Sequence, residues 1–136
     1  MIKHLRENGR ITLSDLARRI DEPISTVSDR VKRIEKKYFT KYCPLLEYAE
    51  FGYNCPAVIA LGVPAGHKQN LLEFLKEDRR VNSLYHVDSG FQFLVEVICK
   101  DKMELNQWLD GLQTEFQSVV DIFPVLKIEE REKFVP

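Results

Sequence analysis

The feature that most constrains the fold of this chain is the order in which strand-like and helix-like patterns follow one another after residue 56. Apolar residues run together or alternate as in strands at 57–63, 81–87, 91–100 and 119–128, and they recur at helical spacing at 70–78 and 105–116. The order β-α-β-β-α-β is that of the ferredoxin-like split fold. We therefore expect an α+β protein in which two helices cover one face of a four-stranded sheet.

The other face of such a sheet carries no helix, and the strand at 93–99 shows what this face presents. Phe93, Val95, Val97 and Cys99 point to one side of that strand, while Leu94 and Ile98 point to the other. An uncovered sheet face with such side chains is an apolar patch, and apolar patches mark interaction surfaces. Self-association through the sheet is the simplest solution. Pro124 predicts that the last strand lies at an edge or carries a bulge.

The first 40 residues predict three short helices. The first ends at Asn8-Gly9, the second is capped by Thr12 with Asp15 three residues further on, and the third follows Pro23 and covers 24–37. The residues expected to face inward from the second and third helices are Leu13, Leu16, Ala17, Ile20, Ile24, Val27, Val31 and Ile34.

Charge is unevenly distributed along the chain. Residues 1–42 hold eleven Lys and Arg but six Asp and Glu, a net charge of +5, whereas the whole chain has a net charge of −1. A basic head on an acidic body indicates that the head is the part that meets a polyanion.

The outward side of the helix at 24–37 combines hydroxyls near its start with cations further along. Projected at 100° per residue, this side and its flanks carry Ser25, Thr26, Ser28, Asp29, Arg30, Lys32, Arg33 and Lys36. In a major groove, Ser and Thr reach base edges or phosphates while Lys and Arg neutralise the backbone. Asp29 could accept from a cytosine amino group or hold a neighbouring Arg. An ordinary solvated amphipathic helix is the alternative that this segment leaves open.

Other classes of site have little support in the sequence. Cys43, Cys55 and Cys99 are widely spaced and contain no C-x-x-C pair, which favours buried, reduced thiols in a cytoplasmic protein. We expect no metal site and no cofactor, because the histidines are scattered and no phosphate-binding loop or nucleophile motif is present. No apolar run is long enough to span a bilayer, and no secretory signal is evident.

Taken together, "ENGRITLSDLARRI" at 7–20, "STVSDRVKRIEKK" at 25–37, "LGV" at 61–63 and "FLVEV" at 93–97 resemble the Lrp/AsnC, or feast/famine, transcription factors. The resemblance extends over nearly the whole chain. It implies a winged-helix-like helix-turn-helix domain at 1–40, a connecting strand or linker at 41–54, and a ferredoxin-like oligomerisation and effector domain at 55–136. It also implies binding to double-stranded DNA, a homodimer, and higher assemblies that are commonly octamers.

In this family, the loop between the second and third strands of the body helps to bind an amino-acid effector between subunits. The corresponding residues here are Asp88, Ser89, Gly90, Phe91 and Gln92. Family members often carry an aromatic-Asp pair there, and Gln92 stands in the place of the acid. The resemblance thus predicts a weak or altered response to amino acids. The family also tends to have a Gly where this chain has Tyr38, and a first helix that begins several residues earlier.

Two rival functions remain open. The first is a siroheme-decarboxylase-like enzyme, since such enzymes resemble Lrp/AsnC proteins and Tyr85-His86 ends a body strand. The His-Asn-Tyr signature of those enzymes is absent from 81–93, so we do not expect an enzyme. The second is an effector or assembly module whose head has lost specific DNA binding.

Overall fold

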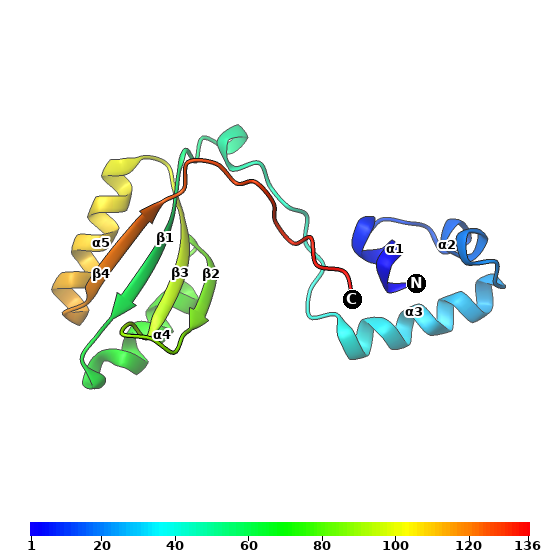
Figure 1. The fold of residues 1–136 in the computed structure, drawn as a ribbon, viewed down its shortest axis with the longest axis horizontal. Coiled ribbons are helices and arrows are strands. Elements are labelled where there is room, and N and C mark those ends of the chain that lie inside the picture. Colours follow the sequence, from blue (N-terminus) through cyan, green and yellow to red (C-terminus); the bar gives the residue numbers. More distant parts are fainter. The chain divides into compact units, whose positions relative to one another are not determined.

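The structure is a computed structural model that describes residues 1–136, which form two compact units. The first unit comprises Met1–Leu45 together with Glu130–Pro136, and the second comprises Leu46–Glu129. Figure 1 shows that the first unit is built from helices and the second from a sheet with helices. The two units are described separately.

The first unit contains α1 (Ile2–Glu7), α2 (Leu13–Ile20) and α3 (Ile24–Tyr38). The predicted cap of α2 is confirmed, because Thr12 Oγ1 accepts a hydrogen bond from the backbone N–H of Asp15 at 3.1 Å. Asp21 ends α2 in the left-handed conformation, with φ of 53°. Asp tolerates this region better than most residues, and it turns the chain sharply into α3.

The three helices enclose a small core. Its buried members are Leu5, Leu16, Ala17, Val27 and Val31, with Met1, Ile11, Ile20, Ile34 and Phe39 packed against them. The inward placement of Leu13 and Ile24 was predicted wrongly, since these side chains are 39% and 51% exposed. Each is the first residue of its helix, and periodicity predicts the angle of a side chain around the helix axis but not whether a neighbouring element covers it.

The connecting strand predicted within 41–54 does not form in this chain. Residues 41–47 have no strand pairing, and they lead into the 3₁₀ helix η1 (Tyr48–Phe51). The start of this connector packs on the first unit instead. The hydroxyl of Tyr42 donates to Glu35 Oε1 at 3.0 Å, and burial together with this bond raises the pKa of Tyr42 to about 12.

The C-terminal segment belongs to the helical unit, whereas the sequence grouped it with the sheet at 55–136. Arg6 of α1 donates to two backbone carbonyls of this segment, from Nη2 to Glu132 O at 2.6 Å and from Nε to Phe134 O at 3.0 Å. These contacts join residues at opposite ends of the sequence, so no pattern among neighbouring residues predicts them. The chain therefore connects the two units twice, through residues near 45 and near 130.

The second unit contains one four-stranded antiparallel sheet. Its strands are β1 (Cys55–Gly62), β2 (Val81–His86), β3 (Phe93–Cys99) and β4 (Val119–Pro124), in the spatial order β2-β3-β1-β4. This confirms the predicted ferredoxin-like α+β body. The last strand is shorter than predicted: it ends at Pro124, and one further hydrogen bond, from the N–H of Val125 to the carbonyl of Pro56 at 2.9 Å, brings it near the start of β1. The edge position predicted from Pro124 is confirmed.

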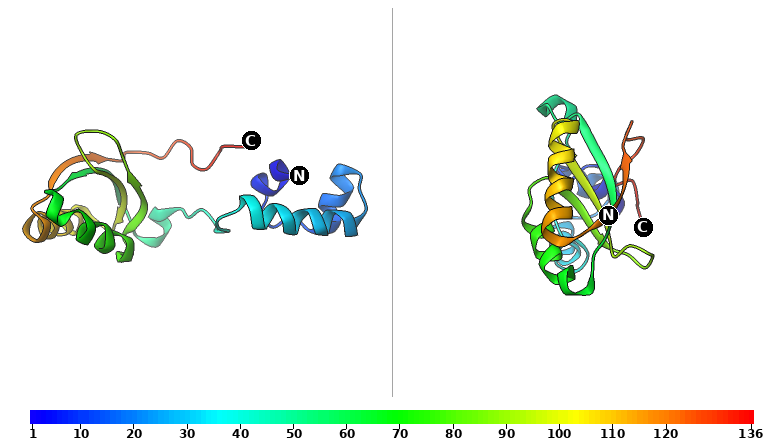
Figure 2. Two further views of the ribbon diagram at one scale, coloured as in Figure 1. Left: turned by 90° about the horizontal axis from the view of Figure 1, so that it is seen from below. Right: turned by 90° about the vertical axis from the view of Figure 1, so that its left-hand side faces the viewer.

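Helices α4 (Lys68–Glu77) and α5 (Lys102–Phe116) cover one face of this sheet (Figure 2). A short 3₁₀ turn, η2 (Ala65–His67), leads from β1 into α4. The core between helices and sheet is made of Ala57, Ile59, Leu61, Val63, Leu71, Leu75, Phe93, Val95, Val97, Cys99, Leu105, Trp108, Leu109, Leu112 and Phe116. The predicted stripe of α5 is thus confirmed in full. None of the helices combines the length and apolar character that crossing a membrane requires.

Candidate nucleic-acid interface

The predicted DNA-reading residues lie on α3, and most of them point to solvent. Exposed positions are Ser25, Thr26, Asp29, Arg30, Lys32, Arg33 and Lys36, while Ser28 is half-buried at the boundary. Val27 and Val31 anchor the opposite side of the helix in the core, with exposed fractions of 0% and 8%. The buried valines therefore determine which side of α3 faces outward, and the hydroxyl and cationic side chains lie on that outward side.

Most of these polar side chains have no partner within the chain. Asp29, Lys32 and Arg33 make no side-chain hydrogen bond or ion pair, so the neighbouring Arg that Asp29 was expected to hold is not bound to it. Unpaired cations on a helix face are available to phosphates at no cost in broken internal bonds.

Arg30 differs from the other predicted residues. Its guanidinium lies 2.5 Å from Glu22 Oε1, in an ion pair between α3 and the turn that precedes it. This pair braces the turn of the helix-turn-helix and partly neutralises Arg30. The second carboxylate oxygen of Glu22, Oε2, is buried without a hydrogen-bond partner.

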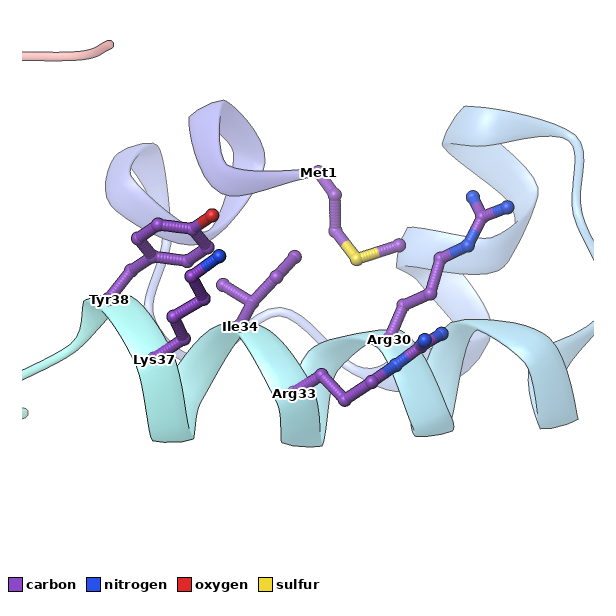
Figure 3. Close-up of a pocket in the computed structure, with 6 residues that line it drawn as sticks. All are labelled: Met1, Arg30, Arg33, Ile34, Lys37 and Tyr38. Carbon is purple, nitrogen blue, oxygen red and sulfur yellow. The ribbon is translucent and has the colours of Figure 1, made fainter.

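A second group of cations lies on the side of α3 that faces the start of the chain (Figure 3). A pocket of about 420 Å³ is lined there by Met1, Arg30, Arg33, Ile34, Lys37 and Tyr38. Lys37 was missing from the predicted site. Its position four residues after Arg33 was the signal for it, since residues at this spacing share a helix face. Arg33 and Lys37 extend the basic surface along the last two turns of α3.

The predicted effector residues form the loop between β2 and β3. Ser89 Oγ accepts from the backbone N–H of Phe91 at 3.1 Å, which closes a tight turn. Asp88, Ser89 and Gly90 are exposed, while Phe91 and Gln92 are half-buried.

Gln92 does not present its amide to this loop. Its Oε1 accepts from the backbone N–H of Val63 at 2.9 Å, and its Nε2 donates to the carbonyl of Val63 at 3.2 Å. The side chain therefore extends the pairing of β3 with the end of β1. The amide oxygen is thus already engaged within the chain, and Gln92 carries no charge to offer a ligand ammonium.

The face of the sheet opposite α4 and α5 carries no helix and is largely apolar, with Asp121 of β4 and Glu96 of β3 as its carboxylates. Leu94 and Ile98 lie on this face as half-buried residues, with Ala60 and Pro56 directly across from them on β1. On the outer strands the same face carries Tyr85 and Phe123, which are 58% and 52% exposed. Glu96 is the carboxylate of β3 on this face, and it accepts a hydrogen bond from Asn82.

No cluster of three or more His, Cys, Asp or Glu side chains has a geometry that could hold a metal ion. His86, at the end of β2, packs its ring against Phe93 at 5.3 Å between centroids.

Comparison with known proteins identifies the class. Residues 1–37 match the family model for a winged helix-turn-helix DNA-binding domain. An HTH-type transcriptional regulator of Pyrococcus furiosus is 32% identical over 106 residues, which cover 77% of this chain and 72% of that protein. An HTH-type transcriptional regulator of Pyrococcus horikoshii is 28% identical over 128 residues, covering 88% of this chain and 81% of that one.

Solved structures show the same fold. AsnC of E. coli superposes with a TM-score of 0.87 at 19% identity, covering 99% of this chain and 93% of AsnC. A transcriptional regulator of Neisseria meningitidis, solved as a complex with L-methionine, gives 0.90 at 18% identity, covering 99% and 91%. The chain is an HTH-type transcriptional regulator. Its fold is that of AsnC, a member of the Lrp/AsnC family, as the sequence resemblance predicted.

Proposed function

We propose that this protein binds double-stranded DNA in a sequence-specific manner, with α3 in the major groove. The observation that carries the proposal is the outward face of α3, where hydroxyls precede cations and none of Thr26, Lys32 and Arg33 is engaged within the chain. Lys32, Arg33, Lys36 and Lys37 would contact phosphates, while Ser25, Thr26 and Asp29 would reach base edges. Ser28 and Arg30 flank this face, and Arg30 also braces the turn.

We propose further that the protein acts as a homodimer formed through the open sheet face. A patch that combines Leu94, Ile98 and Phe123 is costly to leave in water, and a second copy of the same patch complements it. Two heads then present two recognition helices to half-sites about one helical turn apart.

Replacing Lys32 or Arg33 with Ala tests the interface directly. Each variant should bind DNA more weakly, and its plot of log affinity against log salt should be less steep by about one unit per lost phosphate contact. Fluorescence anisotropy over a series of salt concentrations measures both quantities. Lys76→Ala, at an exposed position of α4, is the matched control and should leave the slope unchanged.

Thr26→Ala should instead change the preferred sequence, with little effect on the salt slope, because a base contact carries no counterion release. Selection from a random-sequence duplex library measures this preference. If Lys32→Ala and Arg33→Ala both leave affinity and slope unchanged, α3 does not contact DNA, and an assembly function becomes the better explanation.

We propose that amino acids bind weakly to the loop at Asp88–Gln92. Backbone N–H groups near Ser89 and Gly90 suit a carboxylate, but Gln92 is engaged with Val63 and offers the ammonium nothing. A charge-assisted hydrogen bond contributes about 1.5–3 kcal/mol, so its loss weakens binding by about one to two orders of magnitude. Isothermal titration with L-leucine and L-methionine measures this affinity. Tight binding, in the low micromolar range or better, would contradict the proposal.

A further inference from the structure

Two of the three cysteines face each other across neighbouring strands of the sheet. Cys55, the first residue of β1, is the register partner of Cys99, the last residue of β3. The neighbouring partners Pro56 and Ile98 are not hydrogen-bonded to each other, because the carbonyl of Pro56 accepts from Val125 at 2.9 Å and the N–H of Ile98 donates to the carbonyl of Arg80 at 2.8 Å. Hydrogen-bonded and non-hydrogen-bonded pairs alternate along an antiparallel ladder, so Cys55 and Cys99 form a hydrogen-bonded pair.

This kind of pair has the spacing of a disulfide. The Cα atoms of hydrogen-bonded partners lie about 5.5 Å apart, within the range of about 4.4–6.8 Å found in disulfides. Both side chains also project to the same side of the sheet. Cys99 is fully buried in the core beneath the helices, and Cys55 packs against that core. The two thiols are free and directly opposed.

The two sulfurs differ in access. Cys99 has no exposed surface, whereas Cys55 is half-buried and is open to a small reagent. Burial raises the pKa of the Cys99 thiol to about 11, which leaves only a small thiolate fraction and makes this sulfur slow to react with an external reagent at neutral pH. Cys43 is exposed in the connector and has no cysteine opposite it. An oxidant therefore meets Cys55 before it meets Cys99.

We propose that Cys55 and Cys99 are a redox modification site, at which a low-molecular-weight disulfide such as oxidised glutathione closes a cross-strand bond. The Cys55 thiolate attacks the reagent, forms a mixed disulfide and releases one glutathione thiolate. The Cys99 thiolate then attacks the Cys55 sulfur and releases the second glutathione. The protein thiols lose two electrons and two protons, which end as two molecules of reduced glutathione.

The closed bond would join β1 to β3 covalently at the edge of the core. The Cβ atoms of directly opposed strand residues lie about 4.5–5.5 Å apart, wider than the roughly 3.8 Å of a relaxed disulfide. The bond would therefore be strained and easily reduced, which is the property of labile, regulatory disulfides rather than permanent ones. The modification would make the body of this regulator responsive to the thiol redox state, independently of DNA or amino acids.

The experiment uses the folded full chain with Cys43→Ser, so that only the pair can react. After incubation with oxidised glutathione and quenching in acid, the intact mass should fall by two hydrogens, with no glutathione attached. A non-reducing peptide map should link the segments that contain Cys55 and Cys99. In the variant that also carries Cys99→Ala, the reaction should stop at the mixed disulfide, and the mass should rise by one glutathione moiety.

Two results would overturn the inference. One is a stable glutathione adduct on Cys55 while Cys99 is present, because the second sulfur then does not reach the first. The other is the absence of any reaction at Cys55. The variant that also carries Cys55→Ser, with a half-buried substitution that spares the core, should leave Cys99 unmodified and thus confirms the order of attack.

Discussion

Replacing Leu94 with Glu should convert the proposed dimer into monomers and lower the affinity for a two-half-site operator by about two orders of magnitude or more. The large effect has two causes. A carboxylate in an apolar interface is costly to bury without a partner, and Glu96, two residues away on the same face, adds a like charge. Once the dimer is lost, each head binds its half-site alone. It then lacks the roughly 10²–10⁴-fold gain in affinity that comes from linking two binding events.

Light scattering measures the mass of the assembly, and fluorescence anisotropy measures the affinity for the operator. Ile98→Glu, two positions beyond Glu96, should behave in the same way, and insoluble protein would also show that the face cannot be charged. Gln113→Glu, at an exposed position of α5, adds the same charge elsewhere and should remain dimeric. If both Leu94→Glu and Ile98→Glu stay dimeric and soluble, the interface lies on another surface.

Replacing Asp78 with Asn should lower the free energy of unfolding of the sheet-containing unit by about 2–3 kcal/mol at neutral pH. Asp78 follows α4, and its side chain is 7% exposed. It accepts from Trp108 Nε1 at 2.9 Å and from Arg80 Nη2 at 2.8 Å, so it ties the end of α4 to β2 and α5. An amide has one acceptor oxygen where the carboxylate has two, and it has no charge to offer Arg80.

The drop in the free energy of unfolding caused by Asp78→Asn should depend on pH, because of the same contacts. Burial alone would raise the pKa of Asp78, but hydrogen bonds from Arg80 and Trp108, together with the charge of Arg80, outweigh burial and lower it. A carboxylate whose pKa is depressed on folding stabilises the fold fully above its unfolded pKa of about 3.9. That stability is lost as the pH falls through the lower, folded pKa. The difference between wild type and Asp78→Asn should therefore be constant above about pH 5 and shrink below about pH 4.

Urea unfolding followed by Trp108 fluorescence measures this difference, because the chain contains one Trp and it lies in the core of this unit. Asp110→Asn, on the exposed side of α5, is the control and should change the unfolding free energy by less than about 0.5 kcal/mol. Equal stability of wild type and Asp78→Asn at neutral pH would contradict the expected role of Asp78.

The local periodicity of the sequence was sufficient for the elements and for most of their buried faces. The stripe from Leu105 to Phe116 and the alternation from Phe93 to Cys99 both have the burial that their spacing predicted. Pro124 correctly indicated an edge strand, because a residue without an N–H is excluded from the centre of a sheet. These features depend on residues within one or two turns of each other, so a short window contains the information.

Position along an element was harder to predict than its face. Leu13 and Ile24 carry the correct phase for burial, yet they are exposed, and each is the first residue of its helix. Periodicity gives an angle around the helix axis, but it does not say whether a neighbouring element covers the side chain. The sequence was sufficient to predict the candidate DNA-reading face, because that prediction needed only the angular positions of the residues around the axis of α3.

The contacts that assign individual roles came from the tertiary structure alone. Gln92 bonds to Val63 across 29 residues, and Arg6 bonds to Phe134 across 128. Cys55 and Cys99 lie opposite each other because of the register between β1 and β3, and this register cannot be predicted from their spacing in the sequence. The sequence by itself determined which segments are helices and strands and which sides are apolar, because these follow from interactions between near neighbours. Which polar groups are already engaged was decided only by folding, because their partners are brought together from distant parts of the chain.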